Sequence, residues 1–509
     1  MARTKTKSKL AAKGSDKTLL FLCIAIFLVL ALTIYVVADG LLMRTSLLQD
    51  KVFISALQKG LDKYPSQISK EDLSKIKYLA ITLNTETYTG FNMQIGYDDA
   101  VQIINRDSEA AKAAEENGEE YVANPDDPTL ESALINVAID EGYIKDFSSL
   151  KLFTNLEYLA LYGMALDKMS YISEISTLKN IDLQAISATD YSPLANMTGV
   201  TYLGIQYCVI DDVTPIAGLV NLERLALSGS AVEDISALDG LVNLKTLQLE
   251  SCGISDVSVL KNYTKLENLA LGGNALTDIS SLSALTGVKQ LDLSTNPDLS
   301  DISAVSGMKG LKNLYVANAA LTELPSLANL TKLEYAYFVG NKLENIDGLA
   351  DNKFIKNLSL GENALSDISA LSGMTELTDL YIEKNAIVDI SPLGSLKKLV
   401  TLNLEGNEIV EIAALGDMTA LENVSLASNQ IEDISVFSDI KNIKYVDFSD
   451  NLIADFSAIE HFEGLEDVIM YGTEESDQFI VEETAEEETD DHEGHDHDED
   501  AAEDEDTVE

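Results

Sequence analysis

The sequence predicts an α/β solenoid, in which one short structural unit is stacked many times along an axis. Within its 509 residues, an apolar-x-apolar pair returns every 22 residues, with a single step of 23 where a loop is longer. A short apolar pair that returns at a fixed spacing indicates units that bury their apolar side chains against one another. The first residue of the pair stands at sixteen positions: Val137, Leu159, Ile181, Leu203, Leu225, Leu247, Leu269, Leu291, Leu314, Ala336, Leu358, Leu380, Leu402, Val424, Val446 and Val468.

Each part of the unit has a structural role that follows from its residues. The alternating apolar pair predicts a short strand with one face toward the core. The Asp-Ile-Ser segment that follows begins the return path, where Ser or Asp can cap a helical turn. The Leu-x-x-Leu after it fits a 3₁₀ or short helical stretch that faces the core. The stacked units therefore predict a parallel sheet on the concave side and short helical segments on the convex side.

An asparagine follows most strands in the C-terminal two-thirds of the chain. Its side-chain amide can satisfy backbone groups where the chain turns beneath a strand. In the first part of the chain the same column holds Gly142, Met164, Ile186, Cys208, Ser230 and Cys252, so we expect the later repeats to be more regular. The predicted structural asparagine ladder is Asn274, Asn296, Asn341, Asn363, Asn385, Asn407, Asn429 and Asn451.

The 22-residue unit with Asp-Ile-Ser resembles the leucine-rich repeats of bacterial internalins, over roughly residues 52–472. The resemblance implies a leucine-rich-repeat horseshoe with a helical N-terminal cap. Internalins carry an immunoglobulin-like domain after the repeats, whereas an acidic tail follows the array here, so their role in host-cell invasion is not carried over. The tripeptide begins at Asp234, Asp278, Asp301, Asp367, Asp389 and Asp433.

Residues 39–78 predict a linker and a helical cap, with helical spacing of apolar residues from Val52 to Leu61 and a capping box at Ser69 and Asp72. The first strand follows at Leu79. Because Val137 is assigned as the next strand, the region 79–136 contains an insertion of about 36 residues. We interpret this insertion as a projecting acidic loop with a short helix near residues 98–105. A functional loop and a solvated insertion are both open interpretations.

The N-terminus predicts export. Residues 1–18 are basic, and residues 19–38 form an apolar run whose length as a helix, about 30 Å, matches the hydrocarbon core of a bilayer. The positive-inside rule then places the C-terminal region outside the cell. We favour a retained signal-anchor in the cell membrane. The alternative is a signal peptide cleaved near Ala38, which would give a secreted protein.

Residues 473–509 predict a disordered tail, because they contain twenty acidic residues, no Lys or Arg, and few apolar side chains. Histidine and carboxylate groups are ligands for divalent transition metals, so the tail is a candidate for weak metal binding. The alternative is a solvated acidic tail without a specific role. The candidate ligands are His492, His495, His497, Asp496 and Asp498.

Charge and composition exclude several function classes. A net charge of −50 argues against nucleic acid as a partner, because phosphates require Lys and Arg. His461 is the only histidine outside the tail, and no catalytic triad or zinc motif surrounds it, so we expect neither enzyme activity nor a cofactor. Cys208 and Cys252 lie two repeats apart. Their Cα atoms are therefore expected to be roughly 9–10 Å apart, too far for a disulfide, which predicts two separate buried thiols.

Tyrosines cluster on the predicted concave face. Tyr158 and Tyr202 precede their strand pairs, and Tyr162 follows one, but the densest group falls within four successive strands further along. Tyrosine supplies rigid amphipathic contact area, so this group is a candidate docking site for a protein or glycan ligand. The alternative is that tyrosine simply suits exposed strands. The candidate residues are Tyr315, Tyr335, Tyr337 and Tyr381, bordered by Asp379, Glu383 and Glu405.

We therefore expect an exported, membrane-tethered, non-enzymatic protein that binds a protein or glycan through its concave face. One alternative is an intracellular regulatory scaffold, because SDS-type phosphatase regulators also have 22-residue repeats; the apolar run at 19–38 argues against it. Another is a surface protein that handles metal with its His- and Asp-rich tail.

Overall fold

The structure is a computed structural model that describes residues 48–84, 89–117, 122, 127–462 and 467–470. The predicted membrane segment 19–38 and the predicted metal ligands of the tail (His492, His495, His497, Asp496 and Asp498) lie outside these residues. Within the described ranges, no helix is long and apolar enough to cross a bilayer. The same residues contain no group of three His, Cys, Asp or Glu side chains placed to hold a metal ion.

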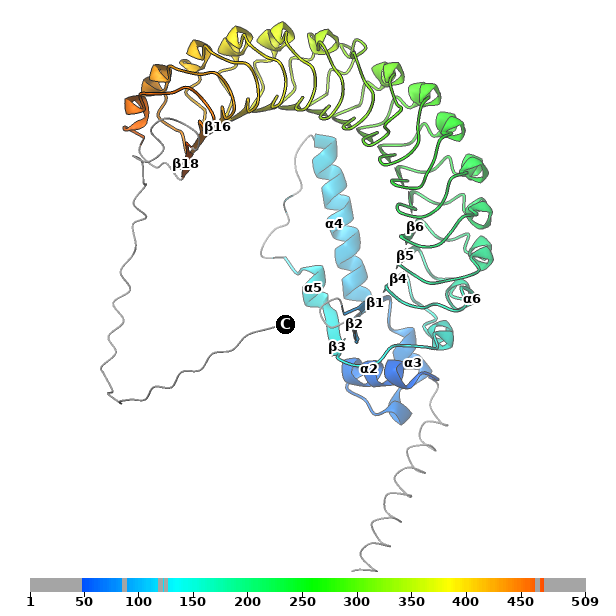
Figure 1. Cartoon of the computed structure of the whole chain (residues 1–509). Coiled ribbons are helices and arrows are strands. Elements are labelled where there is room, and N and C mark those ends of the chain that lie inside the picture. The colour runs from blue at the N-terminus through cyan, green and yellow to red at the C-terminus, as the bar shows by residue number, and fades with distance from the viewer. Residues whose placement is uncertain (1–47, 85–88, 118–121, 123–126, 463–466, 471–509) are drawn as a thin grey trace, which may run out of the picture.

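The chain forms an open horseshoe with a sheet on its inner rim and short 3₁₀ helices on its outer rim (Figure 1). This arrangement confirms the predicted leucine-rich-repeat solenoid. The α-helices are α2 (Lys51–Leu61), α3 (Lys70–Ser74), α4 (Asp98–Asn117), α5 (Leu130–Ala133) and α6 (Ser170–Ser173). The strands are β1 (Tyr78–Leu83), β2 (Phe91–Gly96), β3 (Leu134–Ile139), β4 (Tyr158–Tyr162), β5 (Asn180–Gln184), β6 (Tyr202–Gln206), β7 (Arg224–Ala226), β8 (Thr246–Gln248), β9 (Asn268–Ala270), β10 (Gln290–Asp292), β11 (Asn313–Tyr315), β12 (Tyr335–Tyr337), β13 (Asn357–Ser359), β14 (Asp379–Tyr381), β15 (Thr401–Asn403), β16 (Asn423–Ser425), β17 (Tyr445–Asp447) and β18 (Asp467–Ile469).

The parallel part of the sheet keeps the register that the sequence period predicts. From β4 to β18 each strand pairs in parallel with the next, and equivalent repeat positions lie side by side. Leu159 is opposite Ile181, and Leu380 is opposite Leu402. The apolar pairs point inward and form one continuous core, in which Leu380 and Leu402 are almost completely buried.

The start of the array differs from the prediction. The 22-residue spacing assigns Val137 to the parallel stack, but β3 pairs antiparallel with β2, where Val137 lies opposite Met93. β2 in turn pairs antiparallel with β1, and β1 pairs in parallel with β4, with Leu79 opposite Leu159. Leu79 is therefore the residue that precedes Leu159 in the column. Val137 stands 22 residues before Leu159 by coincidence, since an antiparallel pair requires no such spacing.

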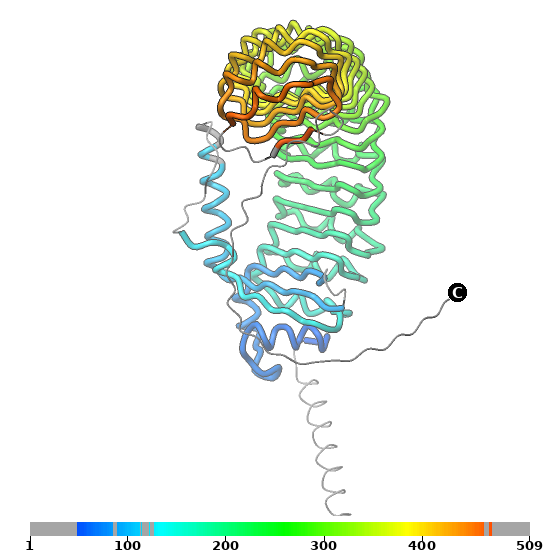
Figure 2. Tube along the Cα trace, turned by 60° about the vertical axis from the view of Figure 1, so that its left-hand side comes forward, coloured from blue at the N-terminus to red at the C-terminus, as the bar shows by residue number. Residues whose placement is uncertain are grey.

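The insertion is also more ordered than the predicted acidic loop with a short helix. Its strands β2 and β3 extend the sheet beyond β1, and α4 continues for 20 residues from Asp98, far past the predicted end near residue 105. Figure 1 shows α4 rising inside the curve of the horseshoe, and Figure 2 shows it standing to one side of the sheet. Ala100, Val101 and Ile103 bury the inner face of its first turns. The insertion is therefore a small α/β unit at the N-terminal end of the concave face.

The helical cap agrees with the sequence prediction. In α2, Phe53, Ala56 and Leu57 are buried, and the N-cap carboxylate of Asp50 accepts hydrogen bonds from the backbone N–H groups of Val52 and Phe53. The second carboxylate oxygen of Asp50 accepts from the backbone N–H of Lys145, 2.8 Å away, which ties the helix to the first convex loop. The cap therefore covers the end of the repeat core.

The predicted capping box at the start of α3 is present. The Ser69 hydroxyl accepts from the backbone N–H of Asp72, and the Asp72 carboxylate accepts from the backbone N–H of Ser69. Lys63 also donates to Asp72, and this hydrogen bond, together with those from Ser69, lowers the pKa of the carboxyl group to about 2. The carboxylate is thus stabilised in its charged form.

Repeats are also connected at their surface by lysine–glutamate pairs 22 residues apart. Both partners stand two residues before the first strand leucine of their own repeats, so stacking places them side by side. Exposed pairs of this kind each contribute only ~0.2–1 kcal/mol. The pairs are Lys179–Glu157, Lys245–Glu223, Lys289–Glu267, Lys356–Glu334 and Lys444–Glu422, with N···O distances of 2.6–3.3 Å.

Candidate functional site on the concave face

Three columns of side chains face the inside of the horseshoe, because alternate residues of a strand point to the same face. We call the residue before the first strand leucine the first column, the residue between the two leucines the middle column, and the residue after the second the third column. Because all the parallel strands share one register, side chains of a column are neighbours across the sheet. The character of the concave face can therefore be followed strand by strand.

The asparagine ladder lies beneath this face and has a structural role. Asn407 is buried, and its Nδ2 donates to the carbonyls of Ile382 (3.1 Å) and Leu404 (2.9 Å). Its Oδ1 accepts from the backbone N–H of Ile387, 3.1 Å away in the preceding repeat. The amides therefore link successive repeats, and the same pattern occurs at Asn274, Asn296, Asn341, Asn363, Asn385, Asn429 and Asn451.

Cysteine takes the place of asparagine in two earlier repeats. The thiol of Cys252 donates to the carbonyl of Leu227, the residue that an asparagine at this position would contact. The thiol of Cys208 donates to Leu183 in the same way and accepts from the backbone N–H of Ile186. Both cysteines are free and buried, which confirms the prediction of two separate thiols. Burial raises the pKa of each thiol.

The structure brings three of the four predicted tyrosines into one group. The rings of Tyr315 and Tyr337, neighbours in the middle column, stack with centroids 4.9 Å apart and planes inclined by 16°. Tyr335, in the first column of the same strand as Tyr337, is 39% exposed. Tyr381 lies two strands from Tyr337, across Ser359. Burial raises the pKa of Tyr315, Tyr337 and Tyr381, so their hydroxyls stay protonated near neutral pH.

The predicted acidic border lies next to Tyr381. Asp379 is in the first column of the same strand, where its carboxylate accepts from the Thr378 hydroxyl at 2.7 Å. Glu383 and Glu405 are neighbours in the third column and are half-buried. The Glu383 carboxylate occupies the space over Gly361, which has no Cβ to exclude it, and its Oε2 is buried without a hydrogen-bond partner among the described residues. We call the four tyrosines and three acids together the tyrosine patch.

A second region of the concave face is absent from the sequence prediction. It is a hollow of about 260 Å³ at the N-terminal end, between strands β1 and β4–β7 on one side and the insertion on the other. The sequence predicts Tyr158, Tyr162 and Tyr202 on the concave face, but it does not predict that they form the walls of a cavity. We call this region the N-terminal hollow, and its lining includes Tyr78, Tyr158, Tyr162, Asp182, Tyr202 and Arg224.

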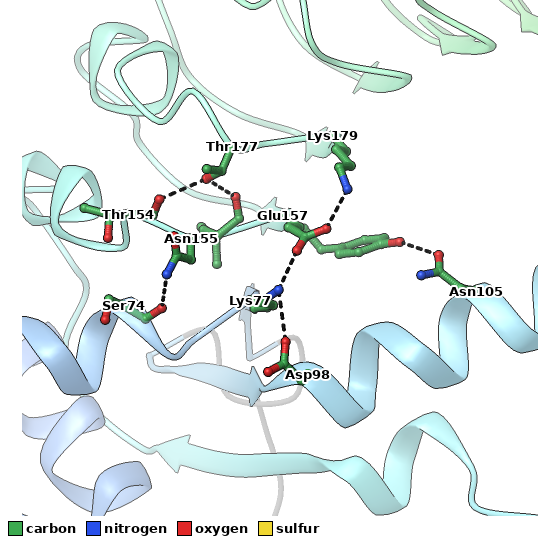
Figure 3. A network of polar contacts seen from close by, with 11 residues as sticks. Ser74, Lys77, Asp98, Asn105, Thr154, Asn155, Glu157, Thr177 and Lys179 are labelled. Atoms are coloured by element: carbon green, nitrogen blue, oxygen red, sulfur yellow. Dashed lines mark hydrogen bonds and ion pairs between the residues drawn. The ribbon is translucent and has the colours of Figure 1, made fainter.

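A polar network fixes the insertion against the array beside this hollow (Figure 3). Glu157 accepts from Lys77 at 2.8 Å and from Lys179 at 2.9 Å, and Lys77 also pairs with Asp98 in the first turn of α4. Although burial raises the pKa of Glu157, the hydrogen bonds from the two lysines outweigh burial and lower it. The Tyr158 hydroxyl donates to Asn105 of α4 at 3.4 Å. The helix is therefore held at a defined position relative to the sheet.

No family model and no curated protein matches the sequence, whereas solved structures do. An internalin of Listeria monocytogenes, internalin F, is 27% identical over 64% of this chain and 89% of its own, with a TM-score of 0.52. This chain is an internalin-like leucine-rich-repeat protein. A leucine-rich-repeat protein of Leptospira interrogans has a TM-score of 0.57 at 20% identity, over 60% of this chain and 81% of its own, and so shares the fold.

In this internalin-like protein, His461 and the aspartates of the Asp-Ile-Ser segments have structural roles. His461, the histidine outside the tail, contacts the carbonyl of Ile440 through Nε2 at 3.2 Å and lies beside Phe462. The aspartate of each Asp-Ile-Ser segment accepts from the backbone N–H of its serine, as at Asp389 and Ser391 (2.8 Å). The aspartate, two residues before the 3₁₀ helix, therefore satisfies the first free N–H group.

Proposed function

We propose that this internalin-like protein binds a protein ligand through the concave face and is not an enzyme. The stacked pair of Tyr315 and Tyr337 beside the exposed ring of Tyr335 supports this proposal most directly. Tyrosine is enriched where protein interfaces concentrate their binding energy, because its ring buries apolar area while its hydroxyl keeps a hydrogen bond. The adjacent Asp379, Glu383 and Glu405 favour a ligand with a basic rim.

The triple variant Y315A/Y337A/Y381A tests the proposal. Residues 39–509 would be immobilised, and proteins and glycans retained by the wild type and the variant would be quantified. The matched control is Y64A/Y143A/Y207A, which removes three tyrosines that are 70%, 43% and 66% exposed and lie outside the strands of the concave sheet. We expect the patch variant to lose most of a specific protein ligand and the control to retain it. Equal retention by both variants would exclude the tyrosine patch, and retention of glycans alone would replace the protein ligand with a glycan.

We further propose that the protein is exported and held at the cell membrane by a retained segment 19–38, with its repeats outside; the alternative is cleavage of this segment, which gives a secreted protein. The basic residues before this segment and its length support this orientation. A topology reporter fused after residue 472 distinguishes export from an intracellular location. A signal outside the cytoplasm is expected, and a cytoplasmic signal would instead favour the regulatory scaffold.

A further inference from the structure

The N-terminal hollow exists because the middle column of the sheet is nearly empty there. Five strands lie side by side here in the order β1, β4, β5, β6 and β7. In four of them the middle-column residue is small: Ala80 in β1, Ala160 in β4, Gly204 in β6 and Ala226 in β7. The remaining strand, β5, contributes Asp182 to the column. Further along, a small residue in this column stands alone between larger side chains, as Ala270 does between Gln248 and Asp292. A floor of small residues with one carboxylate rising from it is thus specific to this end of the concave face.

The carboxylate of Asp182 is only half satisfied. Its Oδ2 accepts from the Tyr162 hydroxyl at 2.7 Å and from Gln184 Nε2 at 3.4 Å. Its Oδ1 is buried and has no hydrogen-bond partner among the described residues. A buried carboxylate oxygen without a donor is energetically costly, so the hollow offers a strong acceptor to any donor that enters it.

Gly204 creates the space that this oxygen occupies. A Cβ at Gly204 would lie 2.6 Å from Asp182 Oδ1 and 2.8 Å from the hydroxyl oxygen of Tyr202, both closer than real Cβ contacts. The backbone of Gly204 is not left-handed, so its glycine is required by this close approach and not by the turn of the chain. The sequence thus keeps the carboxylate and the Tyr202 hydroxyl together over a bare stretch of strand.

The walls of the hollow are aromatic. The rings of Tyr78 and Tyr158 lie 6.2 Å apart with planes inclined by 32°, and Tyr162 and Tyr202 stand on either side of Asp182 in the third and first columns. Burial raises the pKa of all four tyrosines, and the negative charge of Asp182 raises the pKa of Tyr202 further, to about 12. All four rings therefore remain neutral.

Neutral aromatic faces around a carboxylate attract cations. One cation is already present at the rim, where the exposed guanidinium of Arg224 lies over the ring of Tyr202 with its carbon 4.9 Å from the centroid. The strongly negative net charge of the chain adds a long-range attraction for a positively charged ligand.

We propose that the N-terminal hollow binds the primary ammonium group of a ligand, such as a lysine side chain or a chain N-terminus. The ammonium donates to the carboxylate of Asp182, its alkyl chain lies against the tyrosine rings, and Arg224 stays at the rim. A volume of about 260 Å³ admits an aliphatic amine of a few carbons. This site is separate from the tyrosine patch, so the inference does not depend on the proposed function.

The test is a titration of the full chain with n-butylammonium, followed by ligand-observed saturation-transfer NMR, with butyrate as the probe of the same length and opposite charge. The variants are D182N, which keeps the shape of the side chain and removes its charge, and G204A, which fills the floor. The control is D292N, which removes one charge from the same column at β10, where Asp292 accepts from the backbone N–H of Ser294 at 2.8 Å.

We expect saturable binding of butylammonium and not of butyrate, at least a tenfold loss of affinity in D182N and G204A, and wild-type affinity in D292N. Urea unfolding of each variant verifies that it is folded, and G204A keeps the test valid if D182N is not. Equal affinity in wild type and both hollow variants, equal binding of butyrate, or no saturable binding by the wild type would overturn the inference. Y315A/Y337A/Y381A should bind the amine normally, so failure of this site and of the tyrosine patch are distinguishable.

Discussion

Replacing Asn407 by alanine should destabilise the repeat array by a predictable amount. The substitution removes the Oδ1 acceptor of the Ile387 N–H and the Nδ2 donor of the Ile382 and Leu404 carbonyls. The Ile387 N–H then has no partner inside the array, whereas the carbonyls of Ile382 and Leu404 each keep a second asparagine donor, Asn385 and Asn429. A buried polar group that loses its partner costs about 1–3 kcal/mol. The Ile387 N–H is the one group left unpaired, which predicts a loss of about 1–3 kcal/mol.

Equilibrium unfolding in urea, followed by circular dichroism, measures this loss, and hydrogen exchange of the Ile387 amide reports it locally. The control is Asn442→Ala. Asn442 also donates between repeats, to the carbonyl of Thr419 at 2.8 Å, but this bond is exposed and water can replace it, so we expect a loss below about 1 kcal/mol. Equal effects of the two substitutions, or an unchanged exchange rate at Ile387 in Asn407→Ala, would refute the assignment of the ladder as an internal support.

Three further predictions concern the cap, the surface and the thiols. Because the pKa of Asp72 is lowered from an ordinary value of 3.8 to about 2 in the folded chain, its stabilising effect should be complete above about pH 4 and disappear as the pH falls toward 2. Acid titrations of unfolding for wild type and Asp72→Asn should therefore converge at low pH, and parallel curves would contradict this. Lys444→Met should reduce stability by less than ~1 kcal/mol at low salt and by nothing measurable in 1 M salt, because the ion pair of Lys444 with Glu422 is exposed to solvent. A larger or salt-independent loss of stability would contradict the assignment of this pair to the surface. Cys208 and Cys252 should react with a thiol reagent only after unfolding, adding two reactive thiols per chain in urea, and rapid reaction of either in the native protein would contradict its burial.

The repeat architecture is predictable because stacking gives every unit the same environment. Each residue type in the unit then returns at a fixed spacing, so the strands, the convex turns and the inward asparagines can all be placed from the period. The insertion does not repeat, and its acidic composition concealed β2, β3 and most of α4. Val137 shows the limit of the period, since a residue can match the spacing and still belong to an antiparallel pair.

The two regions of the concave face differ in how visible they are in the sequence. Tyr315 and Tyr337 were predictable neighbours, because aromatic residues in adjacent repeats of one column must meet. The N-terminal hollow was not predictable, because it depends on the absence of large side chains from the middle column. The small side chains at Ala160, Gly204 and Ala226 carry meaning only when read together across strands, and the position of α4 beside them follows from the packing of the insertion.

The most direct test of the central claim is hydroxyl-radical footprinting of tyrosine side chains, in the free protein and in complex with the protein ligand retained by the wild type. Binding through the concave face predicts that Tyr315, Tyr335 and Tyr337 lose reactivity in the complex while Tyr64 and Tyr207, which lie outside the strands of the concave sheet, do not. Unchanged reactivity of the patch together with protection of Tyr64 or Tyr207 would contradict binding through the concave face.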